Sequence, residues 1–207
     1  MPDARRIVNT HIHAADITLG LLAGGLGSRL GGVDKAWLER EGVAQVVRWS
    51  KRFAGEHGPV LVSANRDLDR HAAHGFRVAR DRSPDLGPLG GLDALAATCA
   101  TPWLFTLPVD LVGVNDCLLR TLSSQRDADG AFAVDADGPQ PLVALWRRDA
   151  LRAATAQAIA ADEAAVHRLR QRLDLRAVVF SGVRFGNLNT PDDLRAAGIA
   201  LPDPPST

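Results

Sequence analysis

The segment LLAGGLGSRLGGVDKAWL, residues 21–38, decides the fold, because an apolar run breaks there into five glycines followed by Asp34 and Lys35. Glycine reaches backbone conformations that other residues avoid and lets amides approach a ligand, and a nearby cation can neutralise a bound anion. The apolar run Ile17–Leu22 is short, which is typical of a buried parallel strand. The segment therefore predicts an α/β fold with a phosphate-binding loop at the C-terminal end of its first strand.

Two common phosphate loops do not match this segment. A Walker A loop, GxxxxGK[ST], fits the glycine spacing of residues 27–32 but needs a lysine where Val33 stands. A dinucleotide fingerprint, GxGxxG, needs a third glycine where Leu30 stands. Glycines interleaved with Arg29 and Lys35 still indicate an anionic ligand, and a nucleotide fits best.

The composition is that of one globular domain over residues 1–207, with 46% hydrophobic and 23% charged residues. We expect a flexible arm over residues 1–16 and a disordered, proline-rich tail over residues 202–207. Lys plus Arg equals Asp plus Glu at 24 each, which argues against nucleic acid as a partner. We find no run long enough to span a membrane and no signal-peptide core, and the two cysteines suit a reducing compartment, so we expect a cytoplasmic protein without a membrane partner.

Three further apolar runs each end in a polar side chain. Val60–Ser63 is followed by Asn65, Phe76–Ala79 by Asp81, and Trp103–Leu107 by Asp110. The amide of Asn65 suits a base or ribose, although capping of the next helix would also explain it. Mg²⁺ prefers one or two carboxylates together with phosphate oxygens, so we interpret Asp110 as a magnesium ligand. Because the C-terminal ends of parallel strands meet at one edge, we expect these side chains to converge beside the glycine loop.

The rest of the chain predicts further helices and strands. Amphipathic spacing predicts a helix that begins near Val43 and includes Phe53, and a Pro-Gly turn precedes an apolar helix at Leu89–Thr98. Further helices are predicted at Asn115–Leu122, at two places within Arg147–Leu173, and from Pro191 onward, where Asn189 or Thr190 would be the cap. Further strands are predicted at Ala131–Val134, Gln140–Trp146 and Ala177–Phe180.

The glycine segment LAGGLGSRLGGVDK, residues 22–35, resembles the signature LAGGxSxRMGGxDK of the molybdenum cofactor guanylyltransferases, the MobA family. Further motifs follow in the family's order: the AN after the second strand (64–65), the GPLxG turn (87–91) and the terminal FxNxNTPxDL string (185–194). The chain differs from the family at residues 108–112, PVDLV, where CDxP is usual, and at Gln140, where the family has His.

The resemblance implies a three-layer α/β, Rossmann-like nucleotidyltransferase (GT-A-like) fold with a mostly parallel central sheet. It implies transfer of GMP from GTP to the phosphate of molybdenum-molybdopterin, with release of pyrophosphate and Mg²⁺ as cofactor, and further cofactor-biosynthesis or acceptor proteins as partners. The catalytic residues would be Arg29, Lys35 and Asp110, with Asp110 as metal ligand. The nucleotide would contact Leu22, Ala23, Gly24, Gly25, Lys35, Asn65, Asp81 and Asp110, and the acceptor Gln140, Asn187 and Asn189.

Two alternatives remain open from the sequence. A cytidylyl or sugar-phosphate nucleotidyltransferase would share the fold, and the choice of guanine depends on Gly25 and the family pattern. The second alternative is a non-catalytic GTP-binding module that delivers the cofactor. The altered segment 108–112 favours this alternative.

Overall fold

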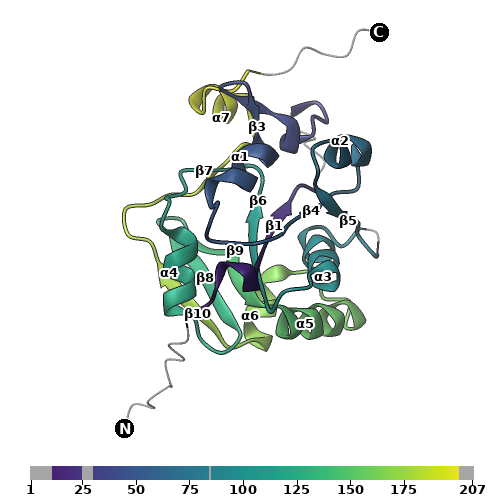
Figure 1. Ribbon diagram of the computed structural model, residues 1–207, viewed down its shortest axis with the longest axis vertical. Coiled ribbons are helices and arrows are strands. Elements are labelled where there is room, and N and C mark those ends of the chain that lie inside the picture. The colour runs from purple at the N-terminus through teal and green to yellow at the C-terminus, as the bar shows by residue number, and fades with distance from the viewer. Residues whose placement is uncertain (1–10, 25–29, 84, 201–207) are drawn as a thin grey trace.

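A seven-stranded sheet forms the centre of the molecule, with strand order β10-β8-β9-β6-β1-β4-β5 (Figure 1). The computed structural model of the chain describes residues 11–24, 30–83 and 85–200. The strands of the sheet are β1 (Ile17–Leu22), β4 (Val60–Ser63), β5 (Arg77–Ala79), β6 (Trp103–Pro108), β8 (Gly130–Asp135), β9 (Gly138–Arg147) and β10 (Leu175–Val179). Neighbouring strands run parallel except where β9 pairs with β6 and β8. The predicted mostly parallel sheet is thus confirmed.

The central strand β1 is buried along its whole length between β4 and β6. Its continuous apolar sequence suits this position, because a parallel strand covered on both faces has no solvent side. A Cβ at Gly20 would lie 2.9 Å from a methyl of Leu104 and 3.0 Å from one of Leu95. Glycine at this position therefore lets a helix pack closely on the strand that leads into the glycine loop.

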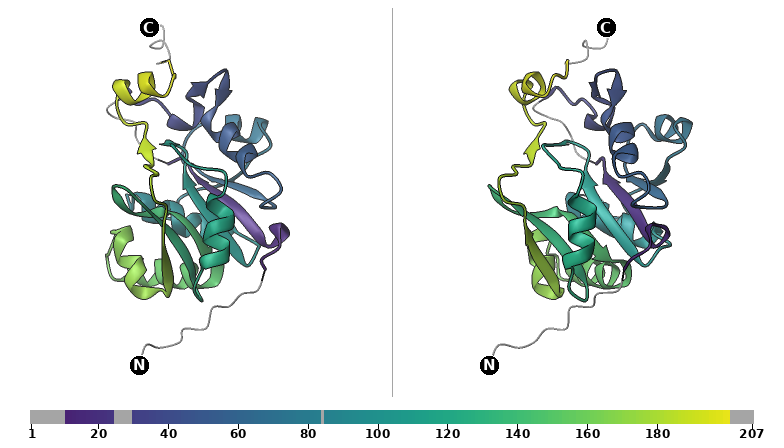
Figure 2. Two further views of the ribbon diagram at one scale, coloured as in Figure 1. Left: turned by 90° about the vertical axis from the view of Figure 1, so that its left-hand side faces the viewer. Right: turned by 60° about the vertical axis from the view of Figure 1, so that its left-hand side comes forward.

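Helices cover both faces of the sheet, which gives the predicted three layers (Figures 1 and 2). One face packs against α1 (Gln45–Arg52) and α4 (Leu118–Gln125). The other packs against α3 (Pro88–Thr98), α5 (Arg148–Ala160) and α6 (Val166–Arg172). We call the two apolar clusters the α1-face cluster and the α3-face cluster. Across the described residues, none of these helices has the length and hydropathy that a membrane crossing requires.

Two predicted helices begin later than expected. Glu41 and Gly42 both have positive φ, 55° and 72°, and turn β2 (Glu39–Arg40) back onto β3 (Val43–Ala44). Val43 therefore belongs to a hairpin, since such a turn favours strand pairing on both sides, and α1 begins only at Gln45.

The second correction concerns Asn115, which the sequence placed in a helix. Its carbonyl accepts the Leu118 N–H at 3.4 Å and its side chain accepts the Cys117 thiol at 3.3 Å. These local bonds make a turn, and α4 begins at Leu118. The predicted strands Ile17–Leu22 and Val60–Ser63 are confirmed to the residue. A turn at residues 135–138 joins β8 to β9.

The C-terminal segment crosses back over the edge of the sheet where β1, β4 and β6 end. Its strand β11 (Gly186–Asn187) pairs antiparallel with β7 (Leu111–Val112), which directly follows Asp110. The last helix, α7 (Pro191–Ala196), begins immediately after this pairing. Residues from the end of the chain therefore lie beside the segment that follows β6.

The remaining elements are short. A 3₁₀ helix at Ala14–Asp16, within the expected arm, leads directly into β1. A second, η3, covers Lys35–Trp37, and α2 covers Leu68–Ala73. Residues 1–10 of the expected arm and the expected tail lie outside the described residues.

Candidate active site

A cavity of about 550 Å³ opens at the C-terminal edge of the sheet. We call it the nucleotide cavity. Three strands each end two residues before a polar side chain that lines it, β4 before Asn65, β5 before Asp81 and β6 before Asp110. Of the residues expected at the site, the cavity brings together Leu22, Ala23, Gly24, Lys35, Asn65, Asp81 and Asp110.

Lys35 joins two distant parts of the chain at the wall of this cavity. Its Nζ donates to Asp110 Oδ2 at 2.8 Å and to Asn189 Oδ1 at 2.6 Å, across 75 and 154 residues of sequence. The Lys35 and Asp110 side chains are 18% and 20% exposed, so water screens their charges less than at the open surface. An ammonium has three donors, which leaves one N–H of Lys35 for a ligand.

The backbone of Lys35 is fixed from two sides. Asp34 caps η3 by accepting the Ala36 N–H at 2.9 Å. Burial raises the pKa of the Asp34 carboxyl above its ordinary value, against the lowering effect of that hydrogen bond. Behind Lys35, the Trp37 ring packs on His71 of α2 with ring centroids 4.7 Å apart. The lysine thus projects from a short, well-packed turn.

Asn189 reaches Lys35 because a helix cap holds it. Asp193 accepts the N–H groups of Asn189 at 3.0 Å and Thr190 at 2.8 Å, and Thr190 completes a capping box on α7. The Thr190 side chain and these two N–H groups lower the pKa of Asp193 below its ordinary value. The cap predicted from the sequence is therefore Thr190, and the amide of Asn189 remains available to bind Lys35.

Asn65 and Asp81 form a reciprocal pair. The Asn65 amide donates to Asp81 Oδ2 at 2.9 Å, and its oxygen accepts the Asp81 backbone N–H at 3.1 Å. Asn65 does not cap the next helix, which was the alternative interpretation, because the N-cap of α2 is Asp67. An exposed amide and a half-buried carboxylate are thus presented together at the mouth of the cavity.

The N-terminus of α3 closes another side of the cavity. Gly87, Pro88 and Gly91 line it, and a Cβ at Gly91 would lie 2.9 Å from both a Leu22 methyl and Ser63 Oγ. This close approach directs the positive end of an 11-residue helix toward the cavity, which favours an anion. No site role was predicted from the sequence for the lining residues Asp34, Ser63, Arg66, Asp85 and Leu142.

Two residues expected on the acceptor side lie outside the lining of the nucleotide cavity, and two others expected at the site are not described. Gln140, on β9, donates to Asp135 Oδ1 at 3.0 Å and does not line the nucleotide cavity. Asn187 is exposed on β11, where it pairs with Leu111. Gly25 and Arg29 lie outside the described residues.

The carboxylate of Asp110 fits a magnesium ion that is shared with phosphate. Its Oδ2 binds Lys35, while Oδ1 accepts no hydrogen bond among the described residues. The described part of the chain contains no group of three His, Cys, Asp or Glu side chains that could hold a metal by itself. Mg²⁺ commonly takes only one or two protein carboxylates and completes its shell with phosphate oxygens and water, so one free oxygen in this cavity is sufficient.

Comparison with known proteins identifies relatives of this chain. A family model described as a MobA-like NTP transferase domain matches residues 20–177. A protein from Cupriavidus taiwanensis named molybdenum cofactor guanylyltransferase is 34% identical over 196 residues, which cover 87% of this chain and 96% of the relative.

Solved structures share the fold at low sequence identity. One is the molybdopterin-guanine dinucleotide biosynthesis protein A from Archaeoglobus fulgidus, with a TM-score of 0.65 and 18% identity over 87% of this chain and 96% of that one. Another is the inositol-1-phosphate CTP transferase from T. maritima, with a TM-score of 0.65 and 14% identity over 89% of this chain and 94% of that one. At this identity the likeness supports the Rossmann-like nucleotidyltransferase fold and leaves the base open.

Proposed function

This chain belongs to the MobA-like NTP transferase family and is a nucleotidyltransferase, and from that premise we propose that it transfers GMP from GTP to the phosphate of molybdenum-molybdopterin. The observation that carries the proposal is the Lys35–Asp110–Asn189 cluster, which joins three separate motifs at the wall of one cavity. The name of the Cupriavidus relative supports guanine and the molybdenum cofactor as substrates.

The reaction breaks one bond and forms another at the same phosphorus. An oxygen of the acceptor phosphate attacks the α-phosphorus of GTP, the bond from that phosphorus to the bridging oxygen breaks, and pyrophosphate leaves with the electron pair. The attacking phosphate is already ionised near pH 7, so the protein needs no general base. Catalysis therefore depends on positioning two anions and dispersing charge. In this proposal the ammonium of Lys35 donates its remaining N–H to a phosphate oxygen.

We propose that the reaction depends on Mg²⁺ held by Asp110. When bound, the ion would act as a Lewis acid on phosphate oxygens and hold them in place. Lys35 would keep the Asp110 carboxylate in one orientation by binding Oδ2, which leaves Oδ1 for the metal. The N-terminus of α3 would stabilise negative charge at the other side of the cavity.

The pair of Asn65 and Asp81 would bind the nucleoside. Together they offer a carboxylate and an amide at the mouth of the cavity, which match the donors and acceptors of a base or a ribose. A cytoplasmic location and further partner proteins remain predictions from the sequence. Cys99 and Cys117 are both free thiols, which suits a reducing compartment.

Asn65→Ala should weaken GTP binding about tenfold, because it removes the amide and leaves Asp81 without its partner, a loss on the order of 1 to 1.5 kcal/mol. Turnover at saturating GTP should change less than about twofold, since the α-phosphorus is held elsewhere. Calorimetric titration with GTP measures the affinity, and Gln171→Ala removes an exposed amide from α6 as a control. An unchanged GTP affinity would exclude Asn65 from the site.

The proposed reaction can be tested with three nucleotides in parallel. Purified protein, molybdenum-molybdopterin and Mg²⁺ are mixed with GTP, CTP or ATP, and pyrophosphate and the dinucleotide product are measured. We expect product with GTP, none with ATP, and loss of product when EDTA removes the metal. A cytosine dinucleotide would instead indicate a cytidylyl transferase, and absence of pyrophosphate with all three nucleotides would favour the non-catalytic delivery module.

A further inference from the structure

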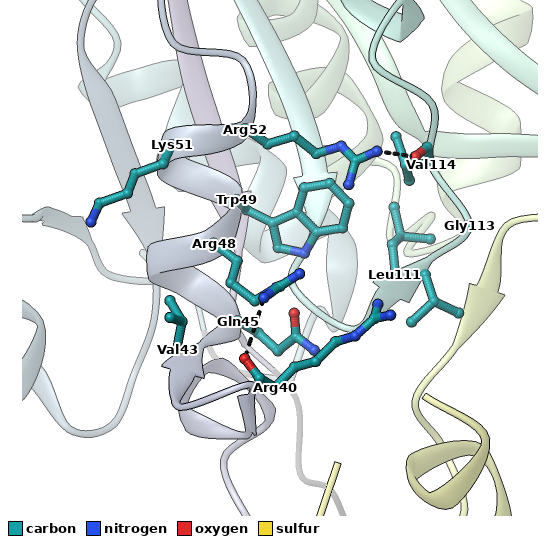
Figure 3. Close-up of a pocket in the computed structure, with 11 residues that line it drawn as sticks. Arg40, Val43, Gln45, Arg48, Trp49, Lys51, Arg52, Leu111, Gly113 and Val114 are labelled. Carbon is teal, nitrogen blue, oxygen red and sulfur yellow. Dashed lines mark hydrogen bonds between the residues drawn. The ribbon is translucent and has the colours of Figure 1, made fainter. Parts of the chain in front are cut away.

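A second cavity, of about 350 Å³, lies between α1 and the chain that follows β6 (Figure 3). We call it the α1 cavity. Its described lining includes four cations, Arg40, Arg48, Lys51 and Arg52, and no carboxylate. Its apolar lining comes from Val43, Trp49, Leu111, Val112 and Val114. Apolar walls beneath several fixed charges are typical of a small-molecule site for an anionic ring compound.

The α1 cavity and the nucleotide cavity share a wall at Asp110. Val109 and Asp110 line the nucleotide cavity, and the next residue, Leu111, lines the α1 cavity. The Trp49 indole N–H donates to the Val109 carbonyl at 3.1 Å, which anchors the helix to this wall. A ligand in the α1 cavity would therefore lie directly across the wall from the proposed site of phosphoryl chemistry.

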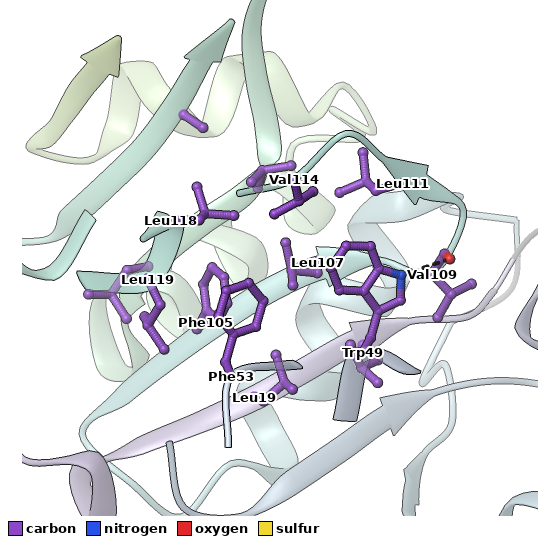
Figure 4. Close-up of a cluster of buried hydrophobic side chains, with 14 of the residues drawn as sticks. Leu19, Trp49, Phe53, Phe105, Leu107, Val109, Leu111, Val114, Leu118 and Leu119 are labelled. Atoms are coloured by element: carbon purple, nitrogen blue, oxygen red, sulfur yellow. Dashed lines mark hydrogen bonds between the residues drawn. The ribbon is translucent and has the colours of Figure 1, made fainter. Parts of the chain in front are cut away.

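The α1 cavity lies on one face of the sheet, and the nucleotide cavity lies at the C-terminal edge. Trp49, Leu111 and Val114 belong to the α1-face cluster, which Figure 4 shows. Of the residues that line the nucleotide cavity, Val109 belongs to this same cluster and Leu22 to the α3-face cluster, so that cavity borders both. In nucleotidyl transfer the attacking and leaving oxygens lie roughly in line on opposite sides of phosphorus. An acceptor phosphate that passes Leu111 would approach from the α1 side, while the N-terminus of α3 lies at another side of the nucleotide cavity.

Gln45 presents a hydrogen-bonding side chain to the α1 cavity. It lines the α1 cavity, its residue is only 3% exposed, and its side chain makes no hydrogen bond with the described residues. Its amide atoms are not among the buried polar atoms that lack a partner, so they meet the solvent in the cavity, where a ligand could take the place of water. Arg40 and Arg48 line the same cavity (Figure 3). The amide both donates and accepts, which matches the amide-like edge of a pterin ring.

Two of the cations are already held in place. Arg48 donates to the Arg40 carbonyl at 3.2 Å and pairs with Glu41 at 3.1 Å. Arg52 donates to the Val114 carbonyl and pairs with Asp116 at 3.0 Å. Among the described residues, Arg40 and Lys51 form no ion pair, so the cavity keeps an excess of positive charge.

We propose that the α1 cavity binds the ring system of the acceptor, a negatively charged pterin, so that its phosphate points past Leu111 toward Asp110. This inference depends on the proposed function for the identity of the acceptor. Gln45 binds the amide-like edge of the pterin, Trp49 supports the ring, and Arg40 and Arg48 neutralise its negative groups. Gln45 and Arg48 thereby determine which acceptor reacts and leave GTP binding to the nucleotide cavity.

The test uses 6-hydroxymethylpterin monophosphate as a stable probe, titrated calorimetrically. Gln45→Leu keeps the size of the side chain and removes both hydrogen-bonding groups, and it should weaken probe binding about tenfold, as loss of one well-placed hydrogen bond does. Arg48→Gln should weaken binding several-fold. Both variants should bind GTP with unchanged affinity. Arg168→Gln, which removes an exposed cation from α6, is the control and should bind the probe as the wild type does.

The outcomes separate this inference from the proposed function. If the wild type does not bind the probe, or if folded Gln45→Leu and Arg48→Gln bind it normally, the inference is wrong, even where GMP transfer proceeds. If the probe binds with the expected pattern but molybdenum-molybdopterin receives no GMP, the proposed function is wrong. Thermal unfolding verifies that each variant is folded, and Arg48→Gln alters a partly exposed side chain, so it decides the question if Gln45→Leu does not fold.

Discussion

Asp110→Asn should lower kcat/KM for GMP transfer by about a thousandfold or more while the protein stays folded. The amide has the shape of the carboxylate but no charge, so the variant loses both the ion pair with Lys35 and the proposed metal ligand. Loss of one electrostatic stabiliser of a transition state costs about 3 to 4 kcal/mol, and here two contributions are lost together. Pyrophosphate release with Mg²⁺, GTP and acceptor measures the effect.

The control for this experiment is Asp149→Asn. Asp149 is an exposed carboxylate at the start of α5, where it pairs with Arg148 at 3.0 Å. Helix α5 packs on the face of the sheet opposite to α1. Its loss should leave kcat/KM unchanged, because a surface ion pair contributes little. Turnover of Asp110→Asn near that of the control would contradict the assignment of Asp110 as metal ligand.

Lys35→Met should lower kcat/KM by about 30-fold to 1000-fold, equivalent to about 2 to 4 kcal/mol of transition-state stabilisation. Methionine keeps most of the length of the side chain and removes its charge. The variant therefore loses the cation that would neutralise the phosphates, and it also loses both hydrogen bonds that hold Asp110 and Asn189 together. Single-turnover kinetics at saturating GTP and acceptor would separate this effect from weaker binding.

Two further variants make the result for Lys35 specific. Lys35→Arg keeps a positive charge but presents a planar guanidinium on a longer side chain, so we expect partial activity between that of wild type and Lys35→Met. Arg168→Met removes an exposed cation of α6 and should have no effect. If Lys35→Met retains more than about a third of wild-type kcat/KM, Lys35 has no catalytic role.

The fold and half of the candidate site could be predicted because their signals are local. Buried parallel strands require continuous apolar runs, and such runs predicted β1 and β4 to the residue. A polar side chain just after such a strand lies at its C-terminal edge wherever the strand sits in the sheet. For this reason Asn65, Asp81 and Asp110 were predicted together, and the structure places them around one cavity.

Features that depend on contacts between distant segments could not be predicted from such local signals. The hairpin at Glu41–Gly42 displaced the start of α1, because turn geometry prevailed over the helical spacing of the apolar residues. Gln140 binds the buried Asp135, a contact that the sequence did not show, and its contact with the acceptor stays a prediction. The alternating pattern shows that Gln140 lies in a strand, but it does not show which residue its side chain binds.

The sequence by itself determined the α/β class, the glycine loop, the strand-end polar residues and the family, because each is encoded within a few consecutive residues. The tertiary structure alone decided that Asn189 binds Lys35 across 154 residues. It also decided that the α1 cavity and the nucleotide cavity meet at Asp110. Both results depend on the pairing of β11 with β7 and on the packing of α1 against β6, and such long-range packing is set by the whole folded core.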